Sequence, residues 1–196
     1  MRPDPAGDRP VPARTLNIAN ALTLLRLLLV PVFVLMLVTP GTGWRIAAFV
    51  VFVLASLTDH IDGEVARRRN LVTDFGKIAD PIADKALTGS ALVTLSALEE
   101  LPWWVTAAIL VREFGVTALR FWVIRHGVIP ASRGGKIKTV LQIVAICAYV
   151  LPLPALLDPV RWVLMGAALL ITVATGADYV VRAIRLRRGG RAEGAA

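Results

Sequence analysis

The sequence predicts an all-α integral membrane protein with six transmembrane helices and a short N-terminal interfacial helix. Three observations predict this fold class. The chain is 56% hydrophobic over its 196 residues, its apolar residues fall in long runs, and its cations gather at the ends of those runs. A membrane-spanning helix needs about 20 consecutive apolar residues. A soluble domain of this length does not need apolar runs of that kind.

Six stretches approach the length of a membrane span. Pro40-Gly41-Thr42-Gly43 ends the first, the second continues as a polar extension through Arg69, and Glu99-Glu100-Leu101-Pro102 ends the third. The fifth is short, so it is expected to draw on the lysines or prolines that flank it. The six expected spans are residues 22–38, 44–59, 77–98, 103–124, 137–151 and 160–184.

The segments outside the spans complete the expected organisation. Residues 1–14 are rich in Pro, Arg and Asp and are expected to be a disordered cytoplasmic N-terminus. Residues 15–21 are expected to form the interfacial helix on the cytoplasmic surface. Residues 15–185 then make one six-helix domain, and residues 186–196 make a basic cytoplasmic tail.

The distribution of Lys and Arg predicts the orientation, since cytoplasmic loops carry the excess of both. The expected outer loops hold only Arg45 and Arg161 as cations, beside Glu99, Glu100 and Asp158. Both termini are therefore expected on the cytoplasmic side of the cell (inner) membrane. The net charge of +8 suits anionic membrane lipids and anionic substrates. Nucleic acid is not an expected partner, because proteins that bind it gather cations on a soluble face. The cytoplasmic side collects Arg2, Arg9, Arg14, Arg67, Arg68, Arg69, Lys77, Arg125, Arg133, Lys136, Lys138, Arg185, Arg187, Arg188 and Arg191.

Four aspartates lie in or beside the second and third spans, where a carboxylate is costly and usually functional. Asp59 and Asp62 are three residues apart, and Asp80 and Asp84 are four apart, so each pair shares a helix face. The short connection between the two spans makes them antiparallel neighbours. Both pairs are therefore expected to meet at the cytoplasmic end.

Carboxylates gathered in this way repel one another unless cations neutralise them. Oxygen ligands in this number favour two Mg²⁺ or Mn²⁺ ions, and a two-metal site serves displacement at phosphorus. Gly63 and Ala66 share the face of Asp59 and leave room for a substrate, and Arg67 can pair with phosphate oxygens. Salt bridges with neighbouring cations are the structural alternative for any one aspartate. They are a poor explanation for all four on matched faces.

The spaced pattern Asp-x2-Asp-Gly-x2-Ala-Arg-x8-Gly-x3-Asp-x3-Asp, residues 59–84, resembles the signature of the CDP-alcohol phosphatidyltransferases. The resemblance implies a six-helix membrane fold, a homodimer, and a cytoplasmic active site that uses CDP-diacylglycerol. It implies metal binding by Asp59, Asp62, Asp80 and Asp84, with Asp84 also the general base. The residues expected to contact the CDP-lipid are Asn20, Thr23, Gly63, Ala66, Arg67 and Thr73.

The flanking segments resemble the branch of this family that uses glycerol 3-phosphate as acceptor. The matches include residues 17–23, Arg112-Glu113-Phe114 and Gly135-Lys136 with Lys138-Thr139, although Ala19 replaces a usual proline. An acceptor that carries a phosphate needs cations near the metals. The expected phosphate-binding residues are Arg112, Arg120, Lys136 and Lys138. A lone arginine inside a membrane is costly, so Arg112 requires an anionic ligand or an acidic partner.

The expected reaction is metal-dependent transfer of a phosphatidyl group to glycerol 3-phosphate, which yields phosphatidylglycerophosphate and CMP in phospholipid biosynthesis. The residues alone require only an anionic acceptor, and the same chemistry could use inositol phosphate, inositol, serine or phosphatidylglycerol. A divalent-cation or proton transporter is the alternative of another class. A transporter should carry polar groups across the whole bilayer, whereas the acids here crowd the cytoplasmic end.

Overall fold

The computed structural model describes residues 18–68, 74–123 and 133–193, and within them the side chains of residues 20–58, 81–119 and 137–185. These residues form six α-helices and one short 3-10 helix, and none of them lies in a strand. The prediction of an all-α chain is confirmed. The elements are α1 (Ile18–Val38), α2 (Thr42–Arg68), α3 (Asp74–Ala97), α4 (Trp103–Val123), α5 (Arg133–Val150), η1 (Ala155–Leu157) and α6 (Asp158–Glu193).

Short turns join α1 to α2 and α3 to α4 at the positions predicted. α1 ends at Val38, and Gly41 follows with a φ of +127°, which favours glycine. α3 ends at Ala97, and Glu99 takes a left-handed φ of 62° without being glycine. Each turn is short, so it reverses the chain and joins two helices that contact each other. Both turns lie at the end of the bundle opposite the aspartates.

Three helices are longer than predicted. Residues 18–21 are the first turn of α1, so the prediction of a separate interfacial helix over 15–21 is wrong for the part described. Residues 18–25 contain no proline or glycine, so the helix continues through Ala21 into the apolar run. α5 begins at Arg133, which gives the short fifth stretch its missing length, and α6 continues through most of the predicted tail to Glu193. The predicted disordered segment 1–14 lies outside the described residues.

Two helical segments of the described chain are long and apolar enough to cross a membrane, Asn20–Val38 and Ala155–Arg185. Thr42–Thr58 and Ile137–Val150 are apolar but shorter. Large apolar side chains also cover the outside of the bundle, among them Leu28, Val111 and Leu170, each about 70% exposed. Exposed apolar surface on this scale is unusual for a monomeric soluble protein and suits a lipid environment.

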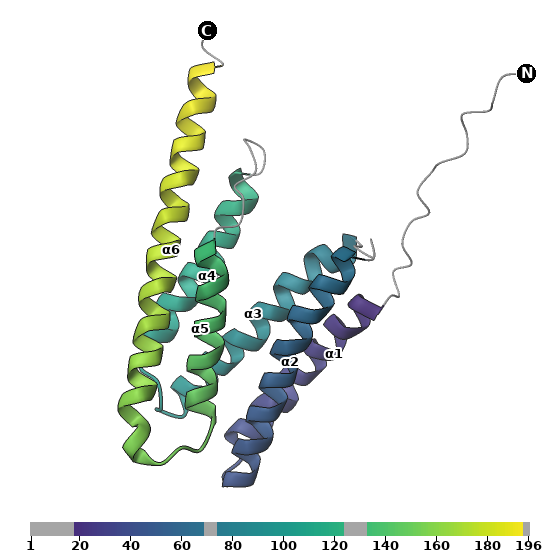
Figure 1. Ribbon diagram of the computed structural model, residues 1–196, viewed down its shortest axis with the longest axis vertical. Helices are drawn as coiled ribbons and strands as arrows, with labels where there is room; N and C mark the ends of the chain where they lie inside the picture. Colours follow the sequence, from purple (N-terminus) through teal and green to yellow (C-terminus); the bar gives the residue numbers. More distant parts are fainter. Residues whose placement is uncertain (1–17, 69–73, 124–132, 194–196) are drawn as a thin grey trace, which may run out of the picture.

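The helices pack as two groups of three (Figure 1). α1 contacts both α2 and α3 in the first group, and α6 lies against both α4 and α5 in the second. Contacts of α5 with α2 and α3, and of α3 with α4, join the groups. α3 therefore belongs to the first group but also reaches the second. Its later half meets α4, where Ser96 and Thr106 form a hydrogen bond.

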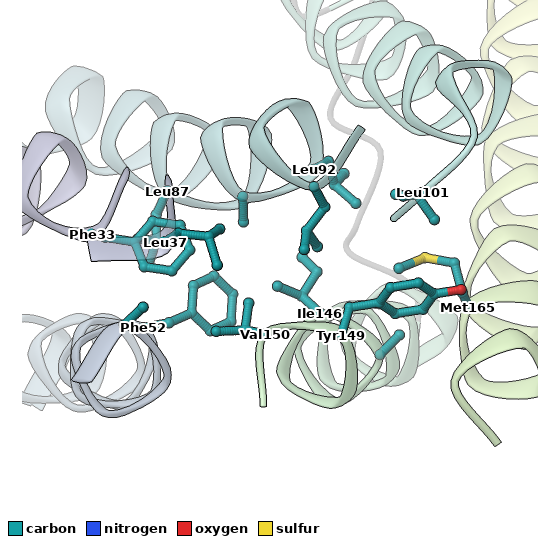
Figure 2. Packing of buried hydrophobic residues seen from close by; sticks show 14 of the residues in the cluster. Phe33, Leu37, Phe52, Leu87, Leu92, Leu101, Ile146, Tyr149, Val150 and Met165 are labelled. Atoms are coloured by element: carbon teal, nitrogen blue, oxygen red, sulfur yellow. The ribbon is translucent and has the colours of Figure 1, made fainter. Parts of the chain in front are cut away.

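The apolar core lies between the two groups (Figure 2). Phe33 of α1 and Phe52 of α2 pack with tilted rings whose centroids are 5.5 Å apart, and Val150 of α5 lies beside Phe52. Among the described core residues, those of α2 stop at Ala55 and those of α3 begin at Leu87. Ala83 of α3, next to Asp84, is also fully buried.

Candidate active site

The two acidic pairs lie on two helices that contact each other. Asp59 and Asp62 lie in the second half of α2, and Asp80 and Asp84 lie in the first half of α3. Helical spacing keeps each pair on one face. The side chains of Asp59, Asp62 and Asp80 lie outside the described ones, as do those of Gly63, Ala66 and Arg67, while Thr73 lies outside the described residues altogether.

Asp84 is the one member of the acidic set whose side chain is described, and it is half-buried. Its backbone carbonyl accepts a hydrogen bond from Thr88 Oγ1 at 2.9 Å. Its carboxylate interacts electrostatically with the ammonium group of Lys138 on α5. This interaction links Asp84 to the second group of helices, where the predicted acceptor-binding cations lie.

A buried polar stripe runs along α1 beside the acidic helices. Asn20, Thr23 and Arg26 recur every three residues, each is at most 3% exposed, and each makes at least one polar or electrostatic interaction. Buried polar groups in a protein interior are normally paired in this way. The stripe brings together two residues predicted to contact the CDP-lipid and adds an arginine.

Helix geometry gives the depth of this stripe. α1 and α2 are antiparallel, and Phe33 stacks on Phe52. Two turns of helix, about seven residues, return to the same face. Counting back seven on α1 leads to Arg26, and counting forward seven on α2 leads to position 59. Arg26 therefore lies at the depth of the first aspartate, on the face of α1 turned toward α2.

Arg112 and Lys138, two of the four predicted acceptor-binding residues, meet at the carboxylate of Glu113. Arg112 Nη1 lies 3.0 Å from Glu113 Oε1, and Lys138 Nζ forms a close ion pair with the same oxygen. The side chains of Glu113 and Lys138 are only 13% and 7% exposed. The acidic partner expected for Arg112 is therefore its own neighbour in the chain, shared with a lysine from another helix.

This cluster carries a net positive charge, because two cations share one carboxylate. Lys85, next to Asp84, also interacts electrostatically with Glu113. Arg120 lies on α4 and Lys136 on α5, but their side chains are outside the described ones. The described part of the predicted acceptor site is thus a buried Arg-Glu-Lys cluster, and its Lys138 interacts electrostatically with Asp84.

A polar cavity of about 390 Å³ lies at the other end of the bundle. Arg45, which lines it, is 14 residues before Asp59 on α2, or about 21 Å along the helix. The charged side chains that line the cavity form ion pairs with one another. Arg45 Nη2 lies 2.5 Å from Glu100 Oε2, and Arg161 Nη1 lies 2.9 Å from Asp158 Oδ1. These pairs tie together the turns of that end, and the cavity is not part of the predicted site.

Comparison with known proteins decides the family of this chain. Residues 16–174 match the family described as CDP-alcohol phosphatidyltransferase, which covers both acidic helices and the Arg-Glu-Lys cluster. The chain belongs to the CDP-alcohol phosphatidyltransferase family. It is therefore an enzyme of this class, and the resemblance found in residues 59–84 is confirmed.

Several relatives of this phosphatidyltransferase are similar over most of their length. A protein of Mycobacterium tuberculosis (strain CDC 1551 / Oshkosh) named "Probable phosphatidylglycerophosphate synthase" is 56% identical over 88% of this chain and 84% of its own. One of Bacillus subtilis (strain 168), named "CDP-diacylglycerol--glycerol-3-phosphate 3-phosphatidyltransferase", is 37% identical over 83% of this chain and 93% of its own. One of Escherichia coli (strain K12) with the same name is 41% identical over 66% of this chain and 74% of its own.

Several contacts of this phosphatidyltransferase could be predicted from the sequence only in part or not at all. Arg26 carries a readable signal, because a lone cation interrupts an apolar run. The double pairing of Glu113 depends on α5 lying beside α4, which no pattern within either helix reveals. Thr175 and Gly176 of α6 contact Arg112 and stand just beyond the segment that matches the family. Nothing in the sequence distinguishes them from the rest of an apolar helix.

Proposed function

We propose that this enzyme transfers the phosphatidyl group of CDP-diacylglycerol to glycerol 3-phosphate, releasing phosphatidylglycerophosphate and CMP. The observation that carries the proposal is the electrostatic interaction of Asp84 with Lys138 of the Arg112–Glu113–Lys138 cluster. It links a group able to take a proton from a hydroxyl to cations able to hold the phosphate of the same small molecule. The names of the relatives, at 37–56% identity for two of them, support the same acceptor.

The proposed setting is the cytoplasmic (inner) membrane, with all six helices spanning it. The apolar outer surface and the two long apolar segments support this placement. The cation distribution supports both termini and the active site on the cytoplasmic side. CDP-diacylglycerol would then enter sideways from the inner leaflet with its acyl tails left in lipid. We also propose that the enzyme acts as a homodimer, as the family resemblance implies.

Asp59, Asp62, Asp80 and Asp84 are proposed to hold two Mg²⁺ or Mn²⁺ ions. The donor set fits, because four carboxylates from two contacting helices supply the hard oxygen ligands that these ions prefer. When bound, such ions polarise a phosphoryl group and stabilise a leaving phosphate.

The stripe on α1 and the small residues on α2 are proposed to receive the CDP-lipid. Asn20 and Thr23 lie buried at about the depth of the acidic end of α2, where their amide and hydroxyl groups can bond polar parts of the nucleotide. Gly63 and Ala66 leave space on the face of Asp59, and Arg67 supplies two parallel donors for phosphate oxygens. Thr73 joins this set by family resemblance.

The acceptor is proposed to bind with its phosphate on Arg112 and Lys138, with Arg120 and Lys136 nearby. Arg112 has five N–H donors, and its hydrogen bonds to Glu113 and Thr175 use two of them. Asp84 would accept the proton of the acceptor's attacking hydroxyl. The hydroxyl oxygen then bonds to the phosphatidyl phosphorus while the bond between that phosphorus and CMP breaks. Glu113 keeps the two buried cations together when no phosphate is present.

The decisive test offers acceptors one at a time to the purified enzyme. With labelled CDP-diacylglycerol and Mg²⁺ or Mn²⁺, glycerol 3-phosphate should give labelled lipid product and CMP in equal amounts. Inositol phosphate, inositol, serine and phosphatidylglycerol should give little of either. Product from one of those acceptors, and none from glycerol 3-phosphate, would move the enzyme to another branch of the family. Lipid product from none of them would refute the transfer itself.

Replacing Glu113 with glutamine is expected to destabilise the enzyme by about 3 kcal/mol, the lower end of the cost of breaking a buried ion pair. The variant leaves two buried cations without their shared negative charge. Glycerol 3-phosphate should therefore raise its thermal unfolding temperature more than it raises that of the wild type, because the phosphate replaces the lost charge.

Glu100→Gln is the matched control, since it breaks an Arg–Glu pair at the opposite end of the bundle. Its unfolding temperature should fall, but glycerol 3-phosphate should stabilise it only as much as the wild type. An equal response of Glu113→Gln and Glu100→Gln to glycerol 3-phosphate would argue against acceptor binding at the cluster.

A further inference from the structure

Arg112 is held from two sides, and one of them is α6. Its Nη2 donates a hydrogen bond to Thr175 Oγ1 at 2.8 Å, while Nη1 reaches Glu113 on α4 itself. The guanidinium is planar, so two partners on its two terminal nitrogens set both its position and the orientation of its plane. α6 thus takes part in aiming the guanidinium.

The hydroxyl of Thr175 is oriented for this role. It lies 2.7 Å from the carbonyl of Ile171 and 3.1 Å from that of Thr172, and donates its proton to this pair of carbonyls one turn earlier in α6. A hydroxyl has one proton and two lone pairs. With the proton directed at the backbone, a lone pair remains for Arg112.

Gly176 provides the space in which the Arg112 side chain lies. A Cβ atom at this position would stand 2.9 Å from Arg112 Cγ and 3.2 Å from its Nε. The first distance is shorter than carbon atoms tolerate. Because Cγ lies near the base of the side chain, a shift there moves the guanidinium by a larger amount. By contrast, Gly115 and Gly166 have no neighbouring atom within 4 Å of such a Cβ.

We propose that Thr175 and Gly176 are positioning residues for the acceptor. Gly176 admits the Arg112 side chain between α4 and α6, and Thr175 aligns its guanidinium so that the remaining N–H groups meet the acceptor phosphate beside Asp84. This inference rests on the proposed function of Arg112. It assigns a part in acceptor selection to α6, from residues just beyond the segment that matches the family.

The proposal predicts a selective kinetic effect. Gly176→Ala and Thr175→Val should each raise the KM for glycerol 3-phosphate at least about tenfold, because misplacing a binding group by about 1 Å can cost a hundredfold in rate. The KM for CDP-diacylglycerol should change less than about twofold, since the CDP-lipid is proposed to bind on α1 and α2. Thr175→Ser retains the hydroxyl and should restore the wild-type KM.

Two comparisons separate positioning from a general loss of structure. Gly166→Ala makes the same substitution on α6 in open space and should leave both KM values unchanged. In an Arg112→Ala background, Gly176→Ala and Thr175→Val should add no further change, because residues that act through one group are not additive. If Gly176→Ala proves too unstable to purify, Thr175→Val against Thr175→Ser tests the same claim.

The outcomes are distinct from those of the proposed function. Equal increases in both KM values, a fall in kcat alone, or effects that persist in the Arg112→Ala background would overturn the positioning role. A wild-type enzyme that uses glycerol 3-phosphate but tolerates both substitutions on α6 would overturn it as well, and would leave the proposed reaction standing. A wild-type enzyme that does not use glycerol 3-phosphate would remove the proposed function first.

Discussion

Asp84→Asn is expected to reduce turnover by about 10²–10⁴-fold, the usual contribution of a general base, and by more where a metal ligand is lost as well. The substitution keeps the size of the side chain but removes its ability to take a proton. Because Asp84 interacts electrostatically with Lys138 of the acceptor cluster, the loss should fall on the acceptor's hydroxyl and not on capture of the CDP-lipid. Labelled CDP-diacylglycerol should therefore still bind the purified variant.

The measurement is CMP release at saturating concentrations of both substrates, together with equilibrium binding of the labelled lipid. Asp158→Asn provides the matched control, because it makes the same change in an ion pair at the far end of the bundle. It should retain wild-type turnover. Unchanged turnover in Asp84→Asn would refute the role of this carboxylate, while a complete loss of lipid binding would leave it a metal ligand without a demonstrated role as base.

Removal of divalent cations is expected to lower activity at least about a hundredfold, and added Mg²⁺ or Mn²⁺ should restore it. Four carboxylates on two contacting helices repel one another without counterions, and the buried arginine on α1 supplies only one positive charge at that depth. The assay is CMP release after chelation, followed by stepwise return of each ion.

A second readout, independent of activity, uses thermal unfolding. Mg²⁺ or Mn²⁺ should raise the unfolding temperature of the wild type, because an ion that binds only the folded state stabilises it. An Asp59→Asn, Asp80→Asn double variant should lose that response. Full activity in excess chelator, or an equal response of the double variant to the ions, would show that the four aspartates do not form a metal site.

Much of the fold could be predicted from the sequence, because hydrophobic runs and helix-ending residues act locally. The turn after Val38 and the turn after Ala97 lie where the proline, glycine and glutamate signals placed them. The errors are at helix ends: α1 takes in residues 18–21, which hold no proline or glycine, and α6 continues through Gly189 and Gly190 to Glu193. A basic segment can remain helical after the apolar run ends, so hydrophobicity alone underestimates its length.

The candidate site likewise has parts that the sequence predicts and parts that it does not. The acidic pairs are readable because helical spacing places Asp80 and Asp84 on one face wherever the helix lies. The need of Arg112 for a partner is readable from the cost of a buried charge. Which group satisfies that need is not readable, since Glu113, Lys138 and Thr175 lie on α4, α5 and α6.

By itself, the sequence determined that this protein is a chain of apolar helices with four aspartates at matched spacings, and with them the family and its chemistry. Those features depend on local periodicity and on residue types that keep their properties in any fold. Only the tertiary structure decided that Lys138 shares Glu113 with Arg112 while it interacts with Asp84, and that Gly176 makes room for the arginine. Such contacts depend on which helices pack together and how closely, and that is a property of the whole bundle.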